Sequence, residues 1–255
     1  MAASRDGNAG KGDAVLVLED VVAGYGELTV LNGTSLRAAR GAITTIIGPN
    51  GAGKSTVFKT VFGLLPVQSG RVVFEGREVT NLSPRRLLEL GISYVPQGRN
   101  IFPELSVRHN LELGATAAGA GIDVAARIES VMDRFPMLRE RGSAQASTLS
   151  GGQQKLLEIA RGLLLDPGLM LIDEPSIGLS PRLVQETFAI LQDLRSKGMS
   201  ILMVEQNAKR ALEISDFGVV IELGRTRMTG EARAILADPQ VGQLFLGGGL
   251  AADAA

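Results

Sequence analysis

The clearest chemistry in this sequence belongs to one glycine-rich segment that contains a lysine and a serine. It reads Gly48-Pro49-Asn50-Gly51-Ala52-Gly53-Lys54-Ser55-Thr56, follows a β-branched run and begins a helical pattern. The glycines let backbone N–H groups converge on phosphate oxygens, and a helix N-terminus adds about half a positive charge. Lys54 can reach the β- and γ-phosphates, and the Ser55 hydroxyl can ligate Mg²⁺. The alternative is a turn that merely begins a helix, but the flanking elements favour nucleotide binding.

Two carboxylates end a short apolar run further along the chain. Asp173 and Glu174 follow Leu169-Met170-Leu171-Ile172, which places them at the C-terminal edge of a buried strand. Open α/β sheets bind ligands at that edge. Asp173 is suited to hold Mg²⁺ or its water, and Glu174 to polarise an attacking water as general base. Alone, the pair could also be an acidic strand end or a helix cap.

A second helix N-terminus with little side-chain bulk lies between these segments, at Leu149-Ser150-Gly151-Gly152-Gln153. Such a terminus can bind an anion. One chain rarely needs two of these sites for one phosphate. If two chains met head to tail, Ser150, Gly151 and Gly152 of one could cover the γ-phosphate held by the other. Taken alone, the segment is better explained as a serine N-cap.

The composition excludes several classes of protein. The chain has 255 residues, 45% of them hydrophobic and 21% charged, with a net charge of −1. This balance suits a globular protein with a sizeable core and argues against a general grip on nucleic acid. No apolar run reaches the roughly 18 to 20 residues that cross a bilayer, and the polar segment 1–14 does not resemble a signal peptide. With no cysteine, we expect no disulfide or thiolate metal site, and a cytosolic location.

The elements that must position these residues alternate between strand and helix. Runs of apolar and β-branched residues predict strands, and a periodicity of 3.6 predicts helices, with a mostly helical stretch from about 98 to 165. The sequence therefore predicts a parallel α/β sheet, a small antiparallel β portion before it and an all-helical insertion in its middle. The predicted strands are Val15–Val22, Ser35–Ala39, 42–48, Ile92–Val95, Leu169–Asp173, 201–205 and 218–223, and a β-ribbon is predicted from 70–75 followed by 76–79. The predicted helices outside the insertion are 54–64, 181–197 and 208–214.

In the order of its three motifs, the sequence resembles the ATP-binding-cassette (ABC) ATPases over nearly its whole length, from about Val15 to Gly247. In that family Gly48–Thr56 corresponds to the Walker A loop, Leu149–Gln153 to the signature and Leu169–Glu174 to the Walker B strand. The resemblance implies a P-loop NTPase of RecA-like fold: a parallel-sheet core, an antiparallel β portion and an inserted all-helical subdomain. It also implies ATP and Mg²⁺ as ligands and hydrolysis at a head-to-tail dimer interface.

Three further positions take their roles from this resemblance. Gln97 lies where the family has a glutamine that contacts the metal and the water and senses the membrane subunit. Tyr25 lies where an aromatic ring stacks on adenine, a contact worth roughly 1–3 kcal/mol for bases in nucleic-acid binders; without the family it would be only a surface or core aromatic. The segment 176–180 resembles the D-loop, which crosses the dimer interface.

The sequence departs from the family at one position. Most members have a histidine that touches the γ-phosphate after the strand that follows the D-loop, whereas this chain has Gln206. The single histidine, His109, lies in the helical insertion, and we expect it at the surface. Gln206 keeps a hydrogen-bond donor but cannot take up a proton or carry a charge. Either the catalytic site is weakened, or Gln206 is sufficient for hydrolysis because Glu174 acts as the general base.

The same departure narrows the choice of subfamily within the ABC ATPases. Val204–Ala208 together with Val95–Pro103, and the ending Leu244–Gly247, are similar to ATPases of branched-chain amino acid importers. Close relatives of those import urea, short amides or other hydrophobic amino acids. The resemblance implies a peripheral subunit on the cytoplasmic face of the inner membrane. It would pair with a second ABC ATPase (a heterodimer, with a homodimer also open) beneath transmembrane permease subunits, fed by an extracytoplasmic solute-binding protein.

The predicted organisation is one ABC ATPase domain between two tails. Residues 1–13 and 248–255 are expected to be disordered, and residues 14–247 to form a core (14–97 and 166–247) with a helical subdomain (98–165). We expect Ile101, Phe102 and Pro103 to form an apolar floor for a permease helix, with lobe packing as the alternative. Other functions stay open: an exporter ATPase, a non-transport cassette, or a nucleotide-binding subunit that hydrolyses weakly.

Overall fold

The computed structural model describes residues 14–117 and 123–245 of the chain. The tails 1–13 and 248–255, for which the sequence predicts disorder, lie outside the described residues. Within the described ranges, no helix combines the length and the apolar character needed to cross a membrane.

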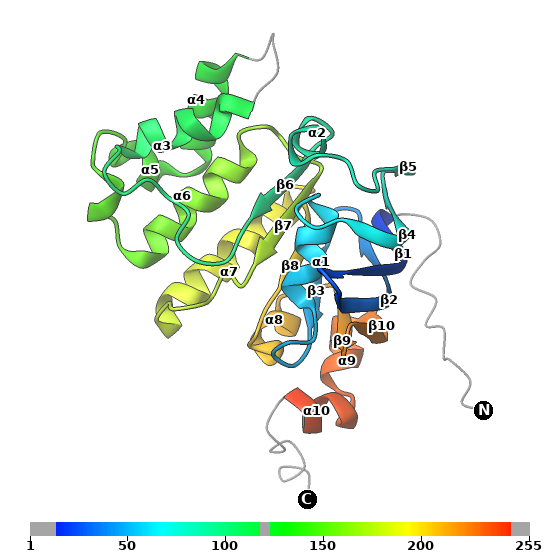
Figure 1. Cartoon of the computed structure of the whole chain (residues 1–255). Helices are drawn as coiled ribbons and strands as arrows, with labels where there is room; N and C mark the ends of the chain where they lie inside the picture. Colours follow the sequence, from blue (N-terminus) through cyan, green and yellow to red (C-terminus); the bar gives the residue numbers. More distant parts are fainter. Residues whose placement is uncertain (1–13, 118–122, 246–255) are drawn as a thin grey trace, which may run out of the picture.

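The central sheet has six strands in the order β10-β9-β3-β8-β7-β6 (Figure 1). Neighbouring strands are parallel except β9 and β10, which are antiparallel. Every residue of β3, β7 and β8 is buried, as expected for parallel strands covered on both faces. The carboxyl ends of these three adjacent strands therefore share one edge. The strands are β3 (Ile43–Ile47), β6 (Ile92–Val95), β7 (Leu169–Asp173), β8 (Ser200–Val204), β9 (Phe217–Glu222) and β10 (Arg225–Glu231).

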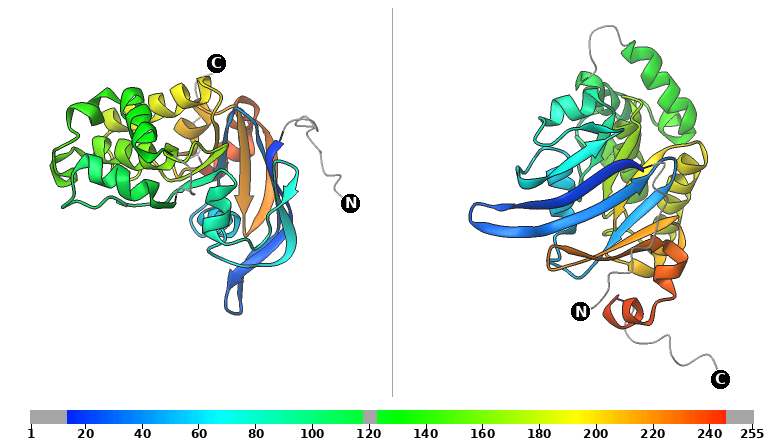
Figure 2. Two further views of the ribbon diagram at one scale, coloured as in Figure 1. Left: turned by 90° about the horizontal axis from the view of Figure 1, so that it is seen from above. Right: turned by 90° about the vertical axis from the view of Figure 1, so that its right-hand side faces the viewer.

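A second, antiparallel sheet packs beside the first and has the order β2-β1-β4-β5. Its strands are β1 (Ala14–Tyr25), β2 (Leu28–Ala39), β4 (Val67–Phe74) and β5 (Arg77–Glu78). Hydrogen bonds from Thr226 Oγ1 to the Ser35 carbonyl, 2.6 Å, and from Asn32 N to the Gly224 carbonyl, 2.8 Å, tie β2 to the outer hairpin of the central sheet. The two sheets therefore remain separate but are joined by these bonds, and Figure 2 shows them from two sides.

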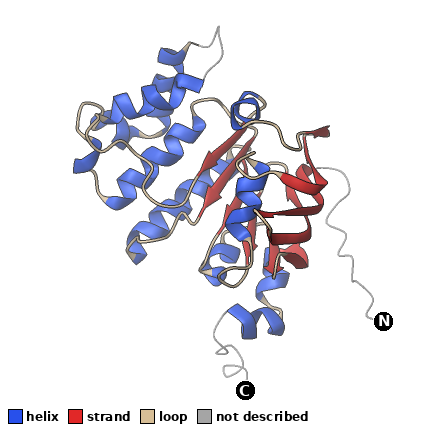
Figure 3. Cartoon of the chain, in the orientation of Figure 1, coloured by secondary structure: helices blue, strands red, loops and turns tan. Residues whose placement is uncertain are grey.

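The helices lie in different parts of the molecule. Helices α3 to α6 gather in a helical lobe at one end of the molecule, whereas α1 lies against the strands (Figures 1 and 3). The helices are α1 (Lys54–Val61), α2 (Pro84–Glu89), α3 (Val107–Gly114), α4 (Val124–Arg134), α5 (Pro136–Glu140), α6 (Gly151–Leu163), α7 (Pro181–Ser196), α8 (Ala208–Glu213), α9 (Ala232–Leu236) and α10 (Pro239–Phe245), with short 3₁₀ turns at Ala115–Ala117 and Ala146–Thr148.

Alternating side chains of the central strands point into different apolar cores. Ile46 joins the core that α1 and the antiparallel sheet enclose. Ile43 faces the opposite core, which contains residues of α6, α7 and the helical lobe. Ile47 contributes to a smaller core with α8 and α9. The phosphate loop after β3 is therefore anchored on a strand that is fixed from several sides.

The structure confirms the predicted α/β class with its antiparallel portion and helical insertion. The predicted strands Val15–Val22 and Ser35–Ala39 are too short, because β1 and β2 continue as a hairpin beyond the core. There, Leu28 and Thr29 are exposed, so no alternation of apolar and polar residues marks the strands. Helices α2, α9 and α10 and strand β10 were not predicted. The boundaries at 98 and 166 stay a prediction.

Candidate functional site

The phosphate loop begins at the end of β3 and leads into α1. Gly51 and Gly53 have φ angles of 80° and 100°, a left-handed conformation that favours glycine. A Cβ on Gly48 would lie 2.2 Å from the carbonyl oxygen of Ile221, so this glycine lets the loop pass close to β9. The sequence thus places glycine where the backbone path of the loop requires it.

Lys54 points back into this loop. Its Nζ donates to the carbonyl oxygens of Gly48 and Pro49, over 2.8 and 3.0 Å. Burial lowers the pKa of Lys54, while the nearby carboxylates of Glu174 and Asp173 oppose that shift. A largely desolvated ammonium held by neutral carbonyls gains most from an anionic partner, and phosphate oxygens would provide one.

Asp173 ends β7 on the same edge of the sheet. Its Oδ1 accepts from Ser55 Oγ at 3.2 Å and its Oδ2 from Tyr94 Oη at 3.4 Å. Burial raises the pKa of Asp173, and the two hydroxyl donors offset part of the rise. Burial also raises the pKa of Tyr94, so its hydroxyl stays a donor. A buried carboxylate beside a serine hydroxyl fits a Mg²⁺ ion, whose charge would stabilise the ionised form.

Glu174 lies one residue beyond the strand in a left-handed conformation, with φ of 47°. Its backbone N–H donates to the Val204 carbonyl over 2.9 Å, which fixes this turn against β8. Gln97 Nε2 donates to Glu174 Oε2 over 2.9 Å. The pKa of Glu174 is raised, chiefly by burial and also by Asp173, with Lys54 opposing. The structure brings this carboxylate close to Gln97 and to Lys54 of the phosphate loop.

Gln206 joins the same edge from the end of β8. Its Nε2 donates to Asn50 Oδ1 in the phosphate loop at 3.3 Å, and the side chain is exposed. The side chain at the histidine position of the family therefore faces the loop that would hold the phosphates.

Sequence reasoning missed the carboxylate beside Gln206. Glu205 is 1% exposed and accepts from the N–H and the Oγ of Ser176, both at 2.8 Å, and from the N–H of Gln206 at 3.1 Å. Burial raises its pKa, and these donors oppose the shift. The signal was present, because Glu205 follows an apolar run just as Asp173 does. It links the segment 176–180 to Gln206.

Tyr25 lies at the end of β1, near α1. Its ring is 45% exposed, its hydroxyl accepts from Lys59 Nζ at 3.2 Å, and that ammonium lies 5.5 Å from the ring centroid. Lys59 and Lys54 both belong to α1. An exposed ring beside the helix that follows the phosphate loop is available for stacking, and Lys59 is a second residue that sequence reasoning missed.

The signature segment lies apart from the phosphate loop, at the start of α6 in the helical lobe. Ser150 caps α6 by accepting from Gln153 N at 3.4 Å, and Gln153 Oε1 accepts from Ser150 N at 3.0 Å. A Cβ on Gly152 would lie 2.6 Å from a methyl carbon of Leu183, so a larger residue here would require the Leu183 side chain on α7 to shift. Leu149 is buried, and Ser150 is exposed. Among the described residues, no hydrogen bond joins this segment to the phosphate loop.

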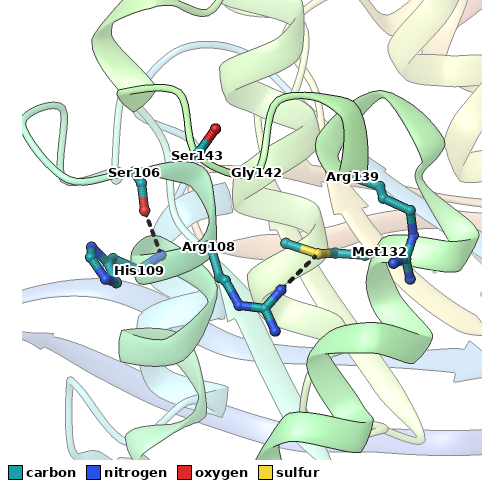
Figure 4. A pocket seen from close by; sticks show the side chains of 7 residues that line it. All are labelled: Ser106, Arg108, His109, Met132, Arg139, Gly142 and Ser143. Atoms are coloured by element: carbon teal, nitrogen blue, oxygen red, sulfur yellow. Dashed lines mark hydrogen bonds between the residues drawn. The ribbon is translucent and has the colours of Figure 1, made fainter.

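His109 is exposed on α3, as expected, with 64% of its side chain accessible. It lines a cavity of about 540 Å³ in the helical lobe (Figure 4). The guanidinium groups there are already paired, Arg108 with Glu129 at 2.7 Å and Arg139 with Glu129 and Asp133 at 2.8 and 2.7 Å. This cavity therefore offers no uncompensated positive charge for a phosphate group.

Comparisons with known proteins agree with this geometry. The family described as "ABC transporter" matches residues 31–177. The chain is 38% identical, over 92% of its length and 100% of the relative's, to the high-affinity branched-chain amino acid transport ATP-binding protein BraG of Pseudomonas aeruginosa. It is 39% identical, over 88% and 95%, to the probable branched-chain amino acid transport ATP-binding protein LivF of Archaeoglobus fulgidus.

A solved structure shares the whole fold. The crystal structure of an ATP-binding cassette of an ABC transporter in its ADP conformation superposes with a TM-score of 0.84, at 30% identity, and covers 92% of this chain and 99% of that one. This similarity confirms the RecA-like P-loop fold with its helical insertion. The chain belongs to the ATP-binding-cassette family of ABC transporters, whose members bind and hydrolyse ATP.

Proposed function

We propose that this chain is the ATPase subunit of an importer for branched-chain or related hydrophobic amino acids. The similarity to BraG and LivF over nearly the full length carries this proposal. The sequence supports it with Gln206 and the residues around it, which resemble the same subfamily.

ATP would bind between the phosphate loop and Tyr25. The N–H groups of Gly48–Thr56 and the start of α1 would surround the phosphates, and Lys54 would exchange its two carbonyl partners for phosphate oxygens. Tyr25 would stack on the adenine from the end of β1. The contact of Gln206 with Asn50 supports a place for Gln206 beside the γ-phosphate.

Ser55, Asp173 and Gln97 are the residues that would hold Mg²⁺. Bound there with ATP, Mg²⁺ would neutralise charge on the β- and γ-phosphates. Protein sites for Mg²⁺ commonly use one or two carboxylates together with substrate phosphates and water. No group of three or more His, Cys, Asp or Glu residues that could bind a metal occurs in the part of the chain described, which accords with a site completed by the nucleotide.

Glu174 would act as the general base. It would polarise a water aligned with the γ-phosphate. Gln97 would donate to its Oε2 and the turn after β7 would fix its backbone. The raised pKa strengthens Glu174 as a proton acceptor for as long as it remains ionised. Gln206 would donate a hydrogen bond without taking part in proton transfer.

The signature would act on the ATP of a second cassette. Leu149–Gln153 lies away from the phosphate loop of its own chain, and the first N–H groups of α6 have no acceptor within the helix. In a head-to-tail dimer, Ser150, Gly151 and Gly152 would contact the γ-phosphate of the partner, with segment 176–180 at the interface. ATP would then favour the closed dimer, and hydrolysis would reopen it.

The working complex would contain two ABC ATPases, preferably different ones, beneath transmembrane permease subunits. An extracytoplasmic binding protein would deliver the solute, and this chain would be peripheral on the cytoplasmic face of the inner membrane. Phe102, at 46% exposure, supports a permease contact near residues 101–103.

The decisive experiment measures uptake of radiolabelled leucine in cells that lack this chain, with urea uptake alongside. The strain is complemented with the wild type or with Lys54→Ala. Loss of leucine uptake, restored only by the wild type, is the expected result. A loss restricted to urea would replace the amino-acid assignment by an amide importer. If neither changed, export or another solute would replace the proposal, and unchanged ATPase activity of a Glu174→Gln complex would indicate a site that does not hydrolyse.

A further inference from the structure

Helix α6 carries a buried ion pair that no part of the nucleotide site uses. The side chains of Lys155 and Glu158, one turn apart, are 6% and 2% exposed, and Lys155 Nζ contacts Glu158 Oε2. Burying two charges is expensive, and such a pair rarely stabilises a protein more than apolar residues of equal volume. The pair is therefore better explained by the groups that its two side chains bind than by a gain in stability.

Both charged groups also bind the backbone of the loop that leaves β6. Glu158 Oε1 accepts from the N–H of Asn100 at 2.6 Å, and Lys155 Nζ donates to the Gly98 carbonyl at 3.3 Å. One turn further along α6, Arg161 donates to the Asn100 carbonyl. Three side chains spaced by three residues thus hold one linking loop, residues 98–102, against one face of the helix.

The linking loop lies between two functional segments. It directly follows Gln97, which binds Glu174, and α6 begins at Gly151 in the signature. At its far end, Phe102 lies beside Arg161, with the guanidinium carbon 5.3 Å from the ring centroid, and its ring is partly exposed. The loop thus connects Gln97 to α6, the helix that begins in the signature.

We infer that Lys155 and Glu158 are positioning residues that clamp the linking loop to the signature helix, so that loop and signature move as one unit. The coupling role in this inference rests on the proposed transport function, whereas the contact between the loop and the helix does not. Neither side chain lies at the nucleotide site. The clamp should govern how a signal at the loop reaches the signature, and should leave the chemistry of the isolated chain intact.

Two double variants separate the clamp from general stability. Lys155→Met with Glu158→Leu removes both charges and the polar contacts of these two side chains with the loop, keeps the volume, and leaves the bond from Arg161 to the Asn100 carbonyl in place. Lys155→Met with Glu158→Gln removes the same charges but keeps an acceptor for the Asn100 N–H. Because both side chains become neutral, neither variant leaves one charge of the Lys155–Glu158 pair buried without the other. Asp193→Leu with Lys197→Met removes an exposed pair on α7 (Nζ–Oδ2 2.6 Å) and is the control.

Hydrogen exchange of residues 98–102 in the full chain tests the contact itself. Exchange should accelerate at least about tenfold in the Met/Leu variant, the factor that a charge-assisted hydrogen bond contributes, and much less in the Met/Gln variant. The control should match the wild type. Equal exchange in the wild type and the Met/Leu variant would overturn the clamp.

The reconstituted complex tests the consequence. The Met/Leu variant should keep the Tm and ATPase activity of the isolated chain, while the ratio of solute-stimulated to basal ATPase falls towards one; the Met/Gln variant should retain part of the stimulation. A proportional fall of both activities would overturn the positioning role. If leucine did not stimulate even the wild type, the substrate proposal would fail, and hydrogen exchange would still decide the clamp.

Discussion

Gln97 Nε2 donates to Glu174 Oε2 across 2.9 Å, which joins the segment after β6 to the end of β7. The contact restrains the carboxylate of Glu174, the proposed base, through protein groups alone. We expect Gln97→Ala to lower turnover by about tenfold, the value of one net hydrogen bond, because Glu174 would gain freedom. Steady-state ATPase assays of the complex would measure this, and Gln240→Ala, on α10, provides the control. A change in KM for ATP without any change in kcat would contradict the positioning of the base.

Glu174→Gln should have a much larger effect. The amide keeps the shape and can still contact Gln97, but it cannot accept a proton. We expect kcat to fall by about 10²–10⁴, the usual contribution of a general base, and ATP-dependent dimers to persist. Single-turnover hydrolysis and gel filtration with ATP would show both. Normal turnover together with no persistent dimer would mean that another group is the base.

Lys54→Ala should remove most nucleotide binding. Lys54 is the buried cation of the loop, and its loss leaves the γ-phosphate without its pre-positioned donor. We expect turnover to fall at least about 100-fold, as for other pre-organised charge contacts. Lys209→Ala, on the exposed face of α8, is the matched control. Fluorescent-nucleotide titration checks the affinity, and wild-type affinity in Lys54→Ala would refute the assignment.

The phosphate loop and Asp173 could be predicted because their positions follow from local pattern. Gly51 and Gly53 indicate a turn that needs glycine, and an apolar run followed by Asp173 indicates the end of a strand at the edge of a sheet. The contacts of Glu205 with Ser176 and of Glu158 with Asn100 were not predictable. They join segments 29 and 58 residues apart, and no local period encodes which buried carboxylate meets which N–H. Likewise, the outer half of β1 and β2 is exposed, so it leaves no hydrophobic alternation to read.

Gln206→His should introduce a pH dependence. Gln206 donates to Asn50 at 3.3 Å and does not titrate, whereas histidine gains a charge near pH 6.5. A protonated imidazole would attract the γ-phosphate more strongly than the amide does. The ratio of variant to wild-type kcat should therefore rise as the pH falls from about 7.5 to about 5.5. A constant ratio over this range would place residue 206 outside contact with the phosphate.

The buried carboxylate of Glu205 leads to a prediction about how stability depends on pH. Burial raises its pKa in the folded chain, so between the unfolded and folded pKa values the folded state binds more protons. The free energy of unfolding then falls as the pH rises from about 4.3 through the folded pKa. Glu205→Gln removes this titration. Its amide NH₂ replaces one of the two acceptor oxygens, so it faces the N–H of either Ser176 or Gln206 and lowers stability overall. Its deficit relative to the wild type should nevertheless shrink as the pH rises. Urea unfolding from pH 4 to pH 8 would measure the difference, with Glu213→Gln, an exposed carboxylate on α8, as control. A deficit that stayed constant or grew with pH would show that the donors of Ser176 and Gln206 outweigh burial.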